Sequence, residues 1–125
     1  MGKIRIDQLE TVLGVELSNY SAQVTERVKA LVKTVAQDCK KDIQRRSPKR
    51  TGRYRKGWRT KAVYDGPGGI RVLVYNQTDG QLTHLLENGH AKAGGGRVSG
   101  IPHIRLAEQK SERQLLQGLK GVLDL

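Results

Sequence analysis

The segment SAQVTERVKALVKTVAQDCKKDIQRRSP, residues 21–48, decides the fold. Apolar residues recur in it every three or four positions, the spacing that places side chains on one face of an α-helix. This apolar stripe consists of Val24, Val28, Leu31, Val35, Cys39 and Ile43. Pro48 ends the pattern, because a proline disfavours helical backbone in the residue before it. The segment therefore predicts a long amphipathic helix over 21–46, with Cys39 buried as a small apolar side chain rather than exposed as a nucleophile.

The residues before this helix are predicted to contribute a strand and a helix. Residues 3–6 alternate between polar and apolar and predict a short strand, whereas helical spacing of apolar residues predicts a first helix over about 8–18. Pro102 suits the first position of a C-terminal helix over 101–123.

The residues between the long helix and the C-terminal helix predict a β-hairpin over 58–76, with a turn at 65–69. Trp58 and Tyr64 are expected on the same face of its first strand. A short helix is expected over 82–88, closed by Gly89. This order of elements predicts an α+β fold with one domain over residues 1–125. The long amphipathic helix packs on a small antiparallel β-sheet, and the C-terminal helix completes the fold.

A two-stranded sheet is marginal alone, so a third strand is expected. Residues 3–6, residues 96–99 or a neighbouring subunit are the candidates for it. The chain has 125 residues, of which 36% are hydrophobic and 4% aromatic, and this composition indicates a small aliphatic core. One cysteine excludes an intrachain disulfide, and neither a membrane span nor a signal peptide is expected.

Positive charge is concentrated in one third of the chain. The formal net charge is +11, and residues 21–61 hold 14 basic against three acidic residues, so the remainder is neutral. Such a segment, with a basic loop over 47–57, needs a polyanion, an acidic partner or water around it. Tyr54 and Trp58 lie among the charges, where they could stack on bases, although Trp58 equally suits a core position. The candidate DNA-contacting or partner-contacting residues are Arg45, Arg46, Lys49, Arg50, Arg53, Arg55, Lys56 and Arg59.

Three histidines raise the question of metal chemistry. His84 and Glu87 are three residues apart, and His90 follows, but this spacing matches neither the HExxH motif nor a zinc finger. We expect Leu85 and Leu86 to point into the core, which would turn His84 and Glu87 toward a polar side. There, together with His103, they would order the glycine-rich segment 91–100. That segment lacks the Lys-Ser/Thr pair of a phosphate-binding loop and is expected to be mobile or bound to a neighbour.

Four blocks, in this order and spacing, resemble the minor tail or tail-completion proteins that join head to tail in long-tailed bacteriophages. They are Pro48 with Thr51-Gly52, Asn76 at a strand end, the run from His84 to His90, and Pro102-His103. The resemblance covers roughly residues 24–119. The structural or assembly residues that this resemblance and the patterns suggest are Pro48, Thr51, Gly52, Trp58, Asn76, His84, Glu87, Gly89, His90, Pro102 and His103.

The resemblance implies a structural virion protein rather than an enzyme, with no cofactor and no membrane. Its members join neck or tail-tube assemblies as rings, so a cyclic homo-oligomer is expected, with tail-terminator, tail-tube and head-connector proteins as partners. Genome DNA passing through the lumen would give the basic loop a sequence-independent polyanion. The expected location is the virion, after synthesis in the cytoplasm of the host bacterium. Two alternatives stay open: a basic nucleic-acid-binding module, and a small metal-dependent hydrolase that uses His84, Glu87 and His90.

Overall fold

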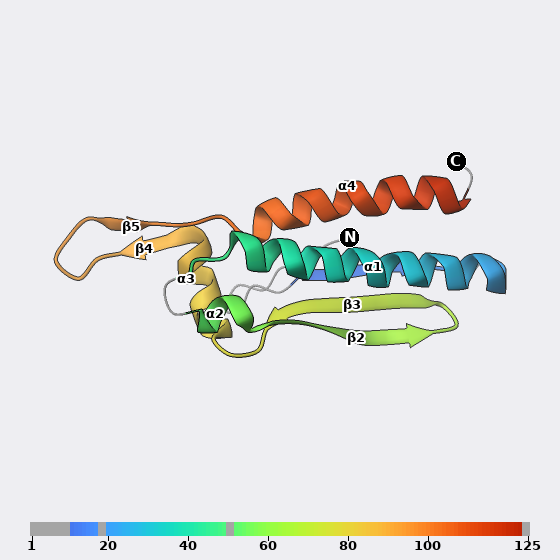
Figure 1. Cartoon of the computed structure of the whole chain (residues 1–125), viewed down its shortest axis with the longest axis horizontal. Coiled ribbons are helices and arrows are strands. Elements are labelled where there is room, and N and C mark those ends of the chain that lie inside the picture. The colour runs from blue at the N-terminus through green and yellow to red at the C-terminus, as the bar shows by residue number, and fades with distance from the viewer. Residues whose placement is uncertain (1–10, 18–19, 50–51, 124–125) are drawn as a thin grey trace.

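The structure is a computed structural model that describes residues 11–17, 20–49 and 52–123. It has the α+β fold that the sequence predicts, with a long helix, small antiparallel sheets and a C-terminal helix (Figure 1). The elements are β1 (Thr11–Glu16), α1 (Ala22–Arg46), α2 (Arg53–Lys56), β2 (Trp58–Gly66), β3 (Gly69–Asn76), a 3-10 turn (Gly80–Leu82), α3 (Thr83–Asn88), β4 (Gly89–Ala91), β5 (Arg97–Ser99) and α4 (Ile104–Leu123).

The long helix α1 confirms the predicted element. Ser21 caps its start, where the hydroxyl accepts a hydrogen bond from the Val24 amide at 3.2 Å. Its 25 residues extend over about 37 Å. The apolar stripe faces the sheet and α4, and Cys39 is buried in it as predicted. Burial raises the pKa of the Cys39 thiol to about 11, so the thiolate is disfavoured at neutral pH.

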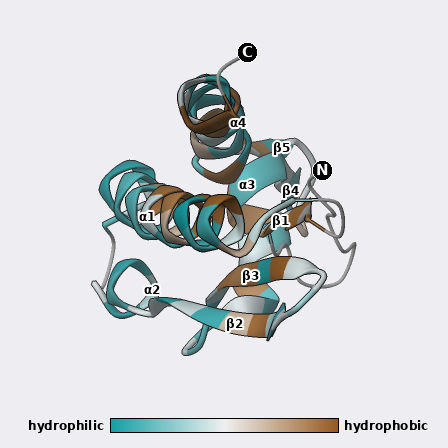
Figure 2. Cartoon of the chain, turned by 90° about the vertical axis from the view of Figure 1, so that its right-hand side faces the viewer, coloured by the Kyte–Doolittle hydropathy of each residue, from teal (hydrophilic) through white to brown (hydrophobic). Residues whose placement is uncertain are grey.

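One antiparallel sheet, in the order β1-β3-β2, packs on one side of α1, and α4 packs on another side (Figures 1 and 2). The central strand β3 turns Ile70, Val72 and Val74 toward α1, where all three are buried. The Nζ atom of Lys29 on α1 donates to the Gly66 carbonyl at 2.7 Å and so ties the helix to the hairpin turn. This arrangement leaves the opposite face of the sheet exposed.

The first strand corrects a wrong prediction, because residues 11–16 form β1 and not part of a helix over 8–18. β1 pairs antiparallel with β3, so Leu13 lies opposite Val72. Leu13 and Leu17 are both buried, and their spacing of four suits one face of either a helix or a strand. Hydrogen bonding to the open edge of β3 decides between the two, since tertiary context overrides weak helical spacing.

β1 is also the third strand of the sheet. The candidate at residues 3–6 lies outside the described residues. The candidate at 96–99 is wrong for this sheet, because β5 pairs with β4 in a separate hairpin. In β2, a bulge between Ala62 and Tyr64 breaks the alternation. The alternation predicted Tyr64 on the same face as Trp58, and this prediction is wrong. Tyr64 lies opposite Arg71, on the other face of the sheet.

The C-terminal helix α4 packs along α1 through small side chains. Ala36 and Cys39 of α1 and Ala107 and Ser111 of α4 are all buried. The close approach of two helices requires such residues, because larger side chains would separate the two backbones. The helix begins at Ile104, so the predicted start with Pro102 in the first helical position is wrong by two residues.

Candidate interaction surface

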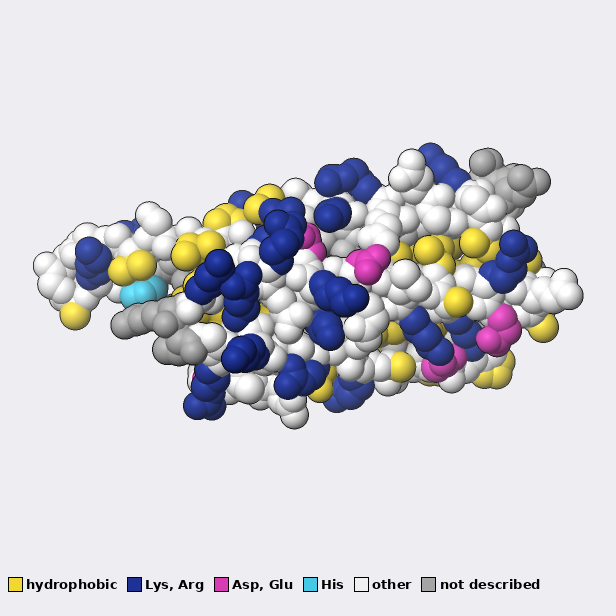
Figure 3. Space-filling view, viewed as in Figure 1, with side chains coloured by type: hydrophobic (Ala, Val, Ile, Leu, Met, Phe, Trp, Pro, Cys, Tyr) yellow, Lys and Arg dark blue, Asp and Glu magenta, His cyan; other side chains and the backbone are white. Residues whose placement is uncertain are grey.

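Lys and Arg side chains, the predicted basic residues among them, gather around the C-terminal end of α1 (Figure 3). Arg45 and Arg46 form the last turn of α1, and α2, which carries three more cations, folds back against it. Arg50 and Thr51 lie outside the described residues. We call this region the basic end; its described members are Arg45, Arg46, Lys49, Arg53, Arg55, Lys56 and Arg59.

Several of these arginines hold the backbone together. Arg55 donates through Nε to the Gln44 carbonyl at 2.7 Å and through Nη2 to the Arg45 carbonyl at 3.0 Å. The Gln44 carbonyl also accepts the Ser47 amide at 3.2 Å, so Arg55 adds a second donor there and supplies a donor to the Arg45 carbonyl, and its positive charge complements the helix dipole. Arg59 likewise donates to the carbonyls of Lys56 at 2.6 Å and Trp58 at 2.9 Å. Both arginines were predicted to contact DNA or a partner, and these structural roles were not predicted from the sequence.

Acidic side chains neutralise part of the basic end. Asp42 is buried against Arg45 and Arg46, whose nitrogens contact its two oxygens. Burial alone would raise the pKa of Asp42, but the hydrogen bonds from these arginines lower it. Arg53 lies 3.2 Å, Nε to Oδ2, from Asp79. Lys49 is exposed beside these pairs and belongs to none of them.

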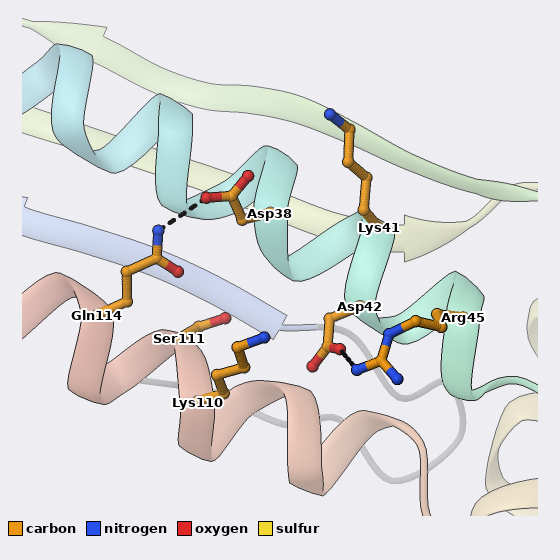
Figure 4. A pocket seen from close by; sticks show the side chains of 7 residues that line it. All are labelled: Asp38, Lys41, Asp42, Arg45, Lys110, Ser111 and Gln114. Atoms are coloured by element: carbon orange, nitrogen blue, oxygen red, sulfur yellow. Dashed lines mark hydrogen bonds and ion pairs between the residues drawn. The ribbon is translucent and has the colours of Figure 1, made fainter.

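A polar groove between α1 and α4, with a volume of about 430 Å³, lies beside the basic end (Figure 4). Gln114 donates to Asp38 across it at 2.8 Å, and Arg45 binds Asp42 at its other end. Opposite charges are thus mixed along its walls and partly cancel. Its residues are Asp38, Lys41, Asp42, Arg45, Lys110, Ser111 and Gln114.

A buried aromatic cluster joins the basic end to the core. Trp58 is buried and donates from Nε1 to the Ser47 hydroxyl at 3.1 Å, so it is a core anchor and not a base-stacking platform. The rings of Tyr54 and Trp58 meet edge to face with centroids 5.7 Å apart. The Tyr54 hydroxyl lies 2.6 Å from His103 Nε2. This cluster fixes α2 against the start of α4.

Glu87 organises the start of α4. Its carboxylate accepts from the backbone amides of His103 and Ile104 at 2.8 Å and of Arg105 at 3.0 Å. His103 Nδ1 lies 3.0 Å from the same carboxylate and 2.6 Å from the Ile101 carbonyl. A carbonyl only accepts, so Nδ1 carries a proton, and Nε2 lies within hydrogen-bond distance of the Tyr54 hydroxyl. Burial alone would raise the pKa of Glu87, but these hydrogen bonds lower it from 4.5 to about 2.

The expected orientation of α3 is wrong. Glu87 points into the protein, whereas Leu85 is exposed and Leu86 is half-buried. His84 is exposed, with Nδ1 3.1 Å from the Asn88 side chain, and His90 is exposed beside the Ala91 carbonyl. The structure therefore separates His84 and His90 from Glu87. In the described part of the chain, His, Cys, Asp and Glu form no cluster of three that could hold a metal ion.

The glycine-rich segment forms the hairpin β4–β5, which projects from the body (Figure 1). Gly89 begins it with φ +79°, and a Cβ there would lie 2.3 Å from the Val98 carbonyl oxygen, so the position requires glycine. Arg97 donates to the Asn88 carbonyl at 2.9 Å, and Ile101 donates to the Leu86 carbonyl at 2.8 Å. The hairpin is therefore anchored at its base, although its residues from 90 to 99 are exposed.

Other residues from the sequence analysis hold turns. Asn76 is buried; its Nδ2 donates to the Tyr54 carbonyl at 2.7 Å, and its Oδ1 accepts from the Asp79 amide at 2.8 Å. Gly52 precedes α2 with φ +77°, a backbone conformation that glycine adopts readily. Pro48 is half-buried beside the basic end.

The exposed face of the sheet continues the basic end and was not predicted from the sequence. Arg59 on β2 lies opposite Tyr75 on β3, and Lys61 is the next outward residue on β2. Lys61 Nζ lies 5.4 Å from the centre of the Tyr75 ring, a cation–π contact. The alternation of charge and aromatic rings along two paired strands could have revealed this extension of the basic end.

A small helix-and-sheet chain with a basic end and a projecting hairpin has the features of a structural subunit that contacts neighbouring chains. Comparison of the sequence with family models supports this class: residues 13–89 match the family described as "Bacteriophage HK97-gp10, putative tail-component". The match covers more than half of the 125 residues, and the chain therefore belongs to this family of phage tail components. The resemblance to a phage tail family is thus confirmed, and the chain is a structural tail protein of a bacteriophage.

No curated protein and no solved structure matches the chain. Membership in a tail-component family implies contacts with other virion proteins and a place in the virion. Within the described ranges, each helix is too short or too polar to cross a membrane.

Proposed function

We propose that the chain is a subunit of a ring at the joint between phage head and tail. The observation that carries the proposal is the match to a tail-component family in a chain with a cluster of cations around the end of α1. Its neighbours there are further copies of itself and the tail-terminator, tail-tube and head-connector proteins. A small aliphatic core and an exposed hairpin suit a subunit that neighbours complete.

In this ring, the basic end faces a polyanion. That polyanion is either the phosphate backbone of the genome in the lumen or an acidic surface of an adjacent virion protein. Contact with phosphates is independent of base sequence and weakens steeply with salt. Trp58 is buried, which argues against base stacking and thus against a dedicated single-strand-binding module.

The proposed role is structural and not enzymatic. Both oxygens of Glu87 are occupied by amides at the start of α4, so this carboxylate serves the fold. His84 and His90 face solvent and contact their own local backbone or side chains. The hydrolase alternative needed these three residues to converge, and they do not.

Deletion of the gene tests the place of the chain in assembly. Cells that lack it should still package DNA into heads but accumulate unjoined heads and tails, which electron microscopy distinguishes. Expression of the wild-type chain from a plasmid should restore infectious particles. Intact infectious virions without the chain would refute the proposal.

A second experiment separates the two polyanions. The variant Lys49→Gln, Lys56→Gln removes two exposed cations and should leave the fold intact, since exposed charges rarely change stability by more than about 0.5 kcal/mol. If the basic end contacts DNA, purified wild-type rings should bind duplex DNA with an affinity that falls steeply with salt, and the variant should bind less tightly. If the basic end contacts protein, purified rings should not bind DNA, and the variant should fail to enter particles. Wild-type particle yield together with unchanged DNA binding would show that the cations face only solvent.

A further inference from the structure

Helix α3 is inverted relative to the usual amphipathic pattern. Its buried residues are Thr83 and Glu87, whereas Leu85 is 41% exposed. Leu82, directly before the helix, is 39% exposed, and Leu86 is half-buried on the same side. Single exposed leucines are common on protein surfaces, but buried polar groups opposite clustered exposed leucines are informative.

Glu87 explains which way the helix is turned. Its carboxylate must reach three amides at the start of α4, so the side of α3 that carries it faces the body. Residues three and four apart share a helix face, which brings Thr83 inward with Glu87 and leaves Leu82 and Leu85 on the outer side. The capping role accounts for the buried carboxylate, but it does not require leucine at the outward positions.

These leucines line a hollow of about 410 Å³ that also touches the aromatic cluster and the base of the hairpin. Among the described residues that line it, Asp79 is the single acid, and Arg53 neutralises that carboxylate at 3.2 Å. Pro48 lines the hollow, and Lys49 follows it directly in the chain. The leucine-lined hollow therefore lies at the margin of the basic end. The lining residues are Pro48, Tyr54, Asp79, Leu82, Leu85, Leu86 and His90.

Charge decides what kind of segment can occupy this hollow. A second copy of the chain carries +11 and would bring cations against cations. Several acidic side chains of the described residues are already engaged: Asp42, Asp65 and Asp79 pair with cations, Asp38 and Glu108 accept hydrogen bonds from Gln114 and Thr11, and Glu87 caps α4. An occupant with its own carboxylates beside apolar residues complements both the leucines and the cations.

We propose that the α3 hollow binds an acidic amphipathic segment of a different virion protein. Apolar side chains of that segment pack on Leu82 and Leu85, and its carboxylates face Lys49 and the neighbouring cations of the basic end. This interface rests on the proposed function, because its partner is present only in the assembled particle.

Photo-crosslinking in assembled virions tests the interface. The residue p-benzoylphenylalanine replaces Leu85, and a control chain carries it at Leu116 on α4, which is 57% exposed and remote from α3. Position 85 should cross-link to another virion protein, at a peptide with more acidic than basic residues, and position 116 should not give this product. A product between two copies of this chain, or no product at 85 beyond the control, would overturn the proposal. Virions that form normally without any copy of the chain would instead refute the proposed function.

Substitution at the same position tests the charge argument. Leu85→Asp removes an apolar contact and adds repulsion, so its incorporation into particles should fall at least about tenfold, as for an interface anchor. Leu85→Lys removes the same contact but adds attraction to the partner's carboxylates, so its incorporation into particles should fall clearly less than that of Leu85→Asp. Equal losses would overturn the acidic partner, and unchanged incorporation of both variants would overturn the docking site. Circular dichroism and thermal unfolding should show that both purified variants remain folded, because Leu85 faces solvent in the isolated chain.

Discussion

Substitution of Glu87 by glutamine should destabilise the fold strongly at neutral pH and weakly in acid. The Glu87 carboxylate is buried and receives the amides of His103, Ile104 and Arg105 together with the His103 ring nitrogen. Glutamine has nearly the same shape but no charge, and it presents an NH₂ group to a site built from donors. It therefore approximates the protonated acid.

The magnitude follows from the pKa of Glu87. Burial raises this pKa and hydrogen bonds lower it more strongly, from 4.5 to about 2. At about 1.4 kcal/mol per tenfold change, this lowering corresponds to about 3 kcal/mol of stabilisation at pH 7. Because the folded pKa lies below the unfolded one, the stabilisation is present above about pH 4.5 and is lost as the pH falls to about 2.

Urea unfolding of the wild type and of the Glu87→Gln variant measures the difference in their free energies of unfolding, with the fluorescence of Trp58 as the signal. This tryptophan is the one in the chain, it is buried, and its ring centre lies 6.3 Å from that of His103. The variant should lose about 3 kcal/mol at pH 7 and less than half of that at pH 3. Glu26→Gln, on the exposed side of α1, should change stability by no more than about 0.5 kcal/mol at either pH. A loss below about 1 kcal/mol at pH 7, or the same loss at both pH values, would contradict the reasoning.

Three further changes probe the structure independently. Arg55→Gln should lower stability by about 1 kcal/mol, because the Arg45 carbonyl loses its side-chain donor and the Gln44 carbonyl keeps only the Ser47 amide; urea unfolding that matches wild type would contradict this role. Gly89→Ala should destabilise by more than about 2 kcal/mol, since its φ is +79° and a Cβ would meet the Val98 carbonyl; thermal unfolding of the variant within a degree of wild type would contradict it. Cys39 should resist thiol reagents at pH 8 in the folded protein and react in urea, because burial raises its pKa to about 11; rapid reaction of the native thiol would show that it is accessible.

Long-range periodicity made most of the fold predictable. The helix over 21–46 rests on six apolar positions that recur every three or four residues, and the hairpin over 58–76 rests on a glycine-rich turn between two alternating runs. The strand at 11–16 was not predictable in the same way. Leu13 and Leu17 suit either element, and pairing with β3, remote in sequence, selects the strand.

The interaction surface was predictable in composition but not in detail. A cluster of cations is visible in the sequence, but the carbonyls that Arg55 and Arg59 contact become neighbours only after the chain folds. The orientation of α3 likewise depends on a contact between segments remote in the sequence, that of the Glu87 carboxylate with the amides at the start of α4. Paired leucines ordinarily point inward, and nothing near Glu87 in the sequence shows that the start of α4 lies above it.

Glu87 couples the stability of the protein to the geometry of its proposed interface. It lies on α3, it holds the start of α4, and the base of the β4–β5 hairpin follows it directly in the chain. The same inward orientation exposes Leu82 and Leu85. A carboxylate that must face inward therefore determines which residues can face a partner.

Loss of the Glu87 charge should consequently disturb the hollow and the hairpin before it disturbs the sheet, whose packing on α1 is separate. Hydrogen exchange of the Glu87→Gln variant at pH 7 should show this order: amides of α3 and the start of α4 should lose more protection than those of β3, whose loss should not exceed the fall in global stability. Uniform loss of protection across both regions would mean that the carboxylate stabilises the whole protein as one unit.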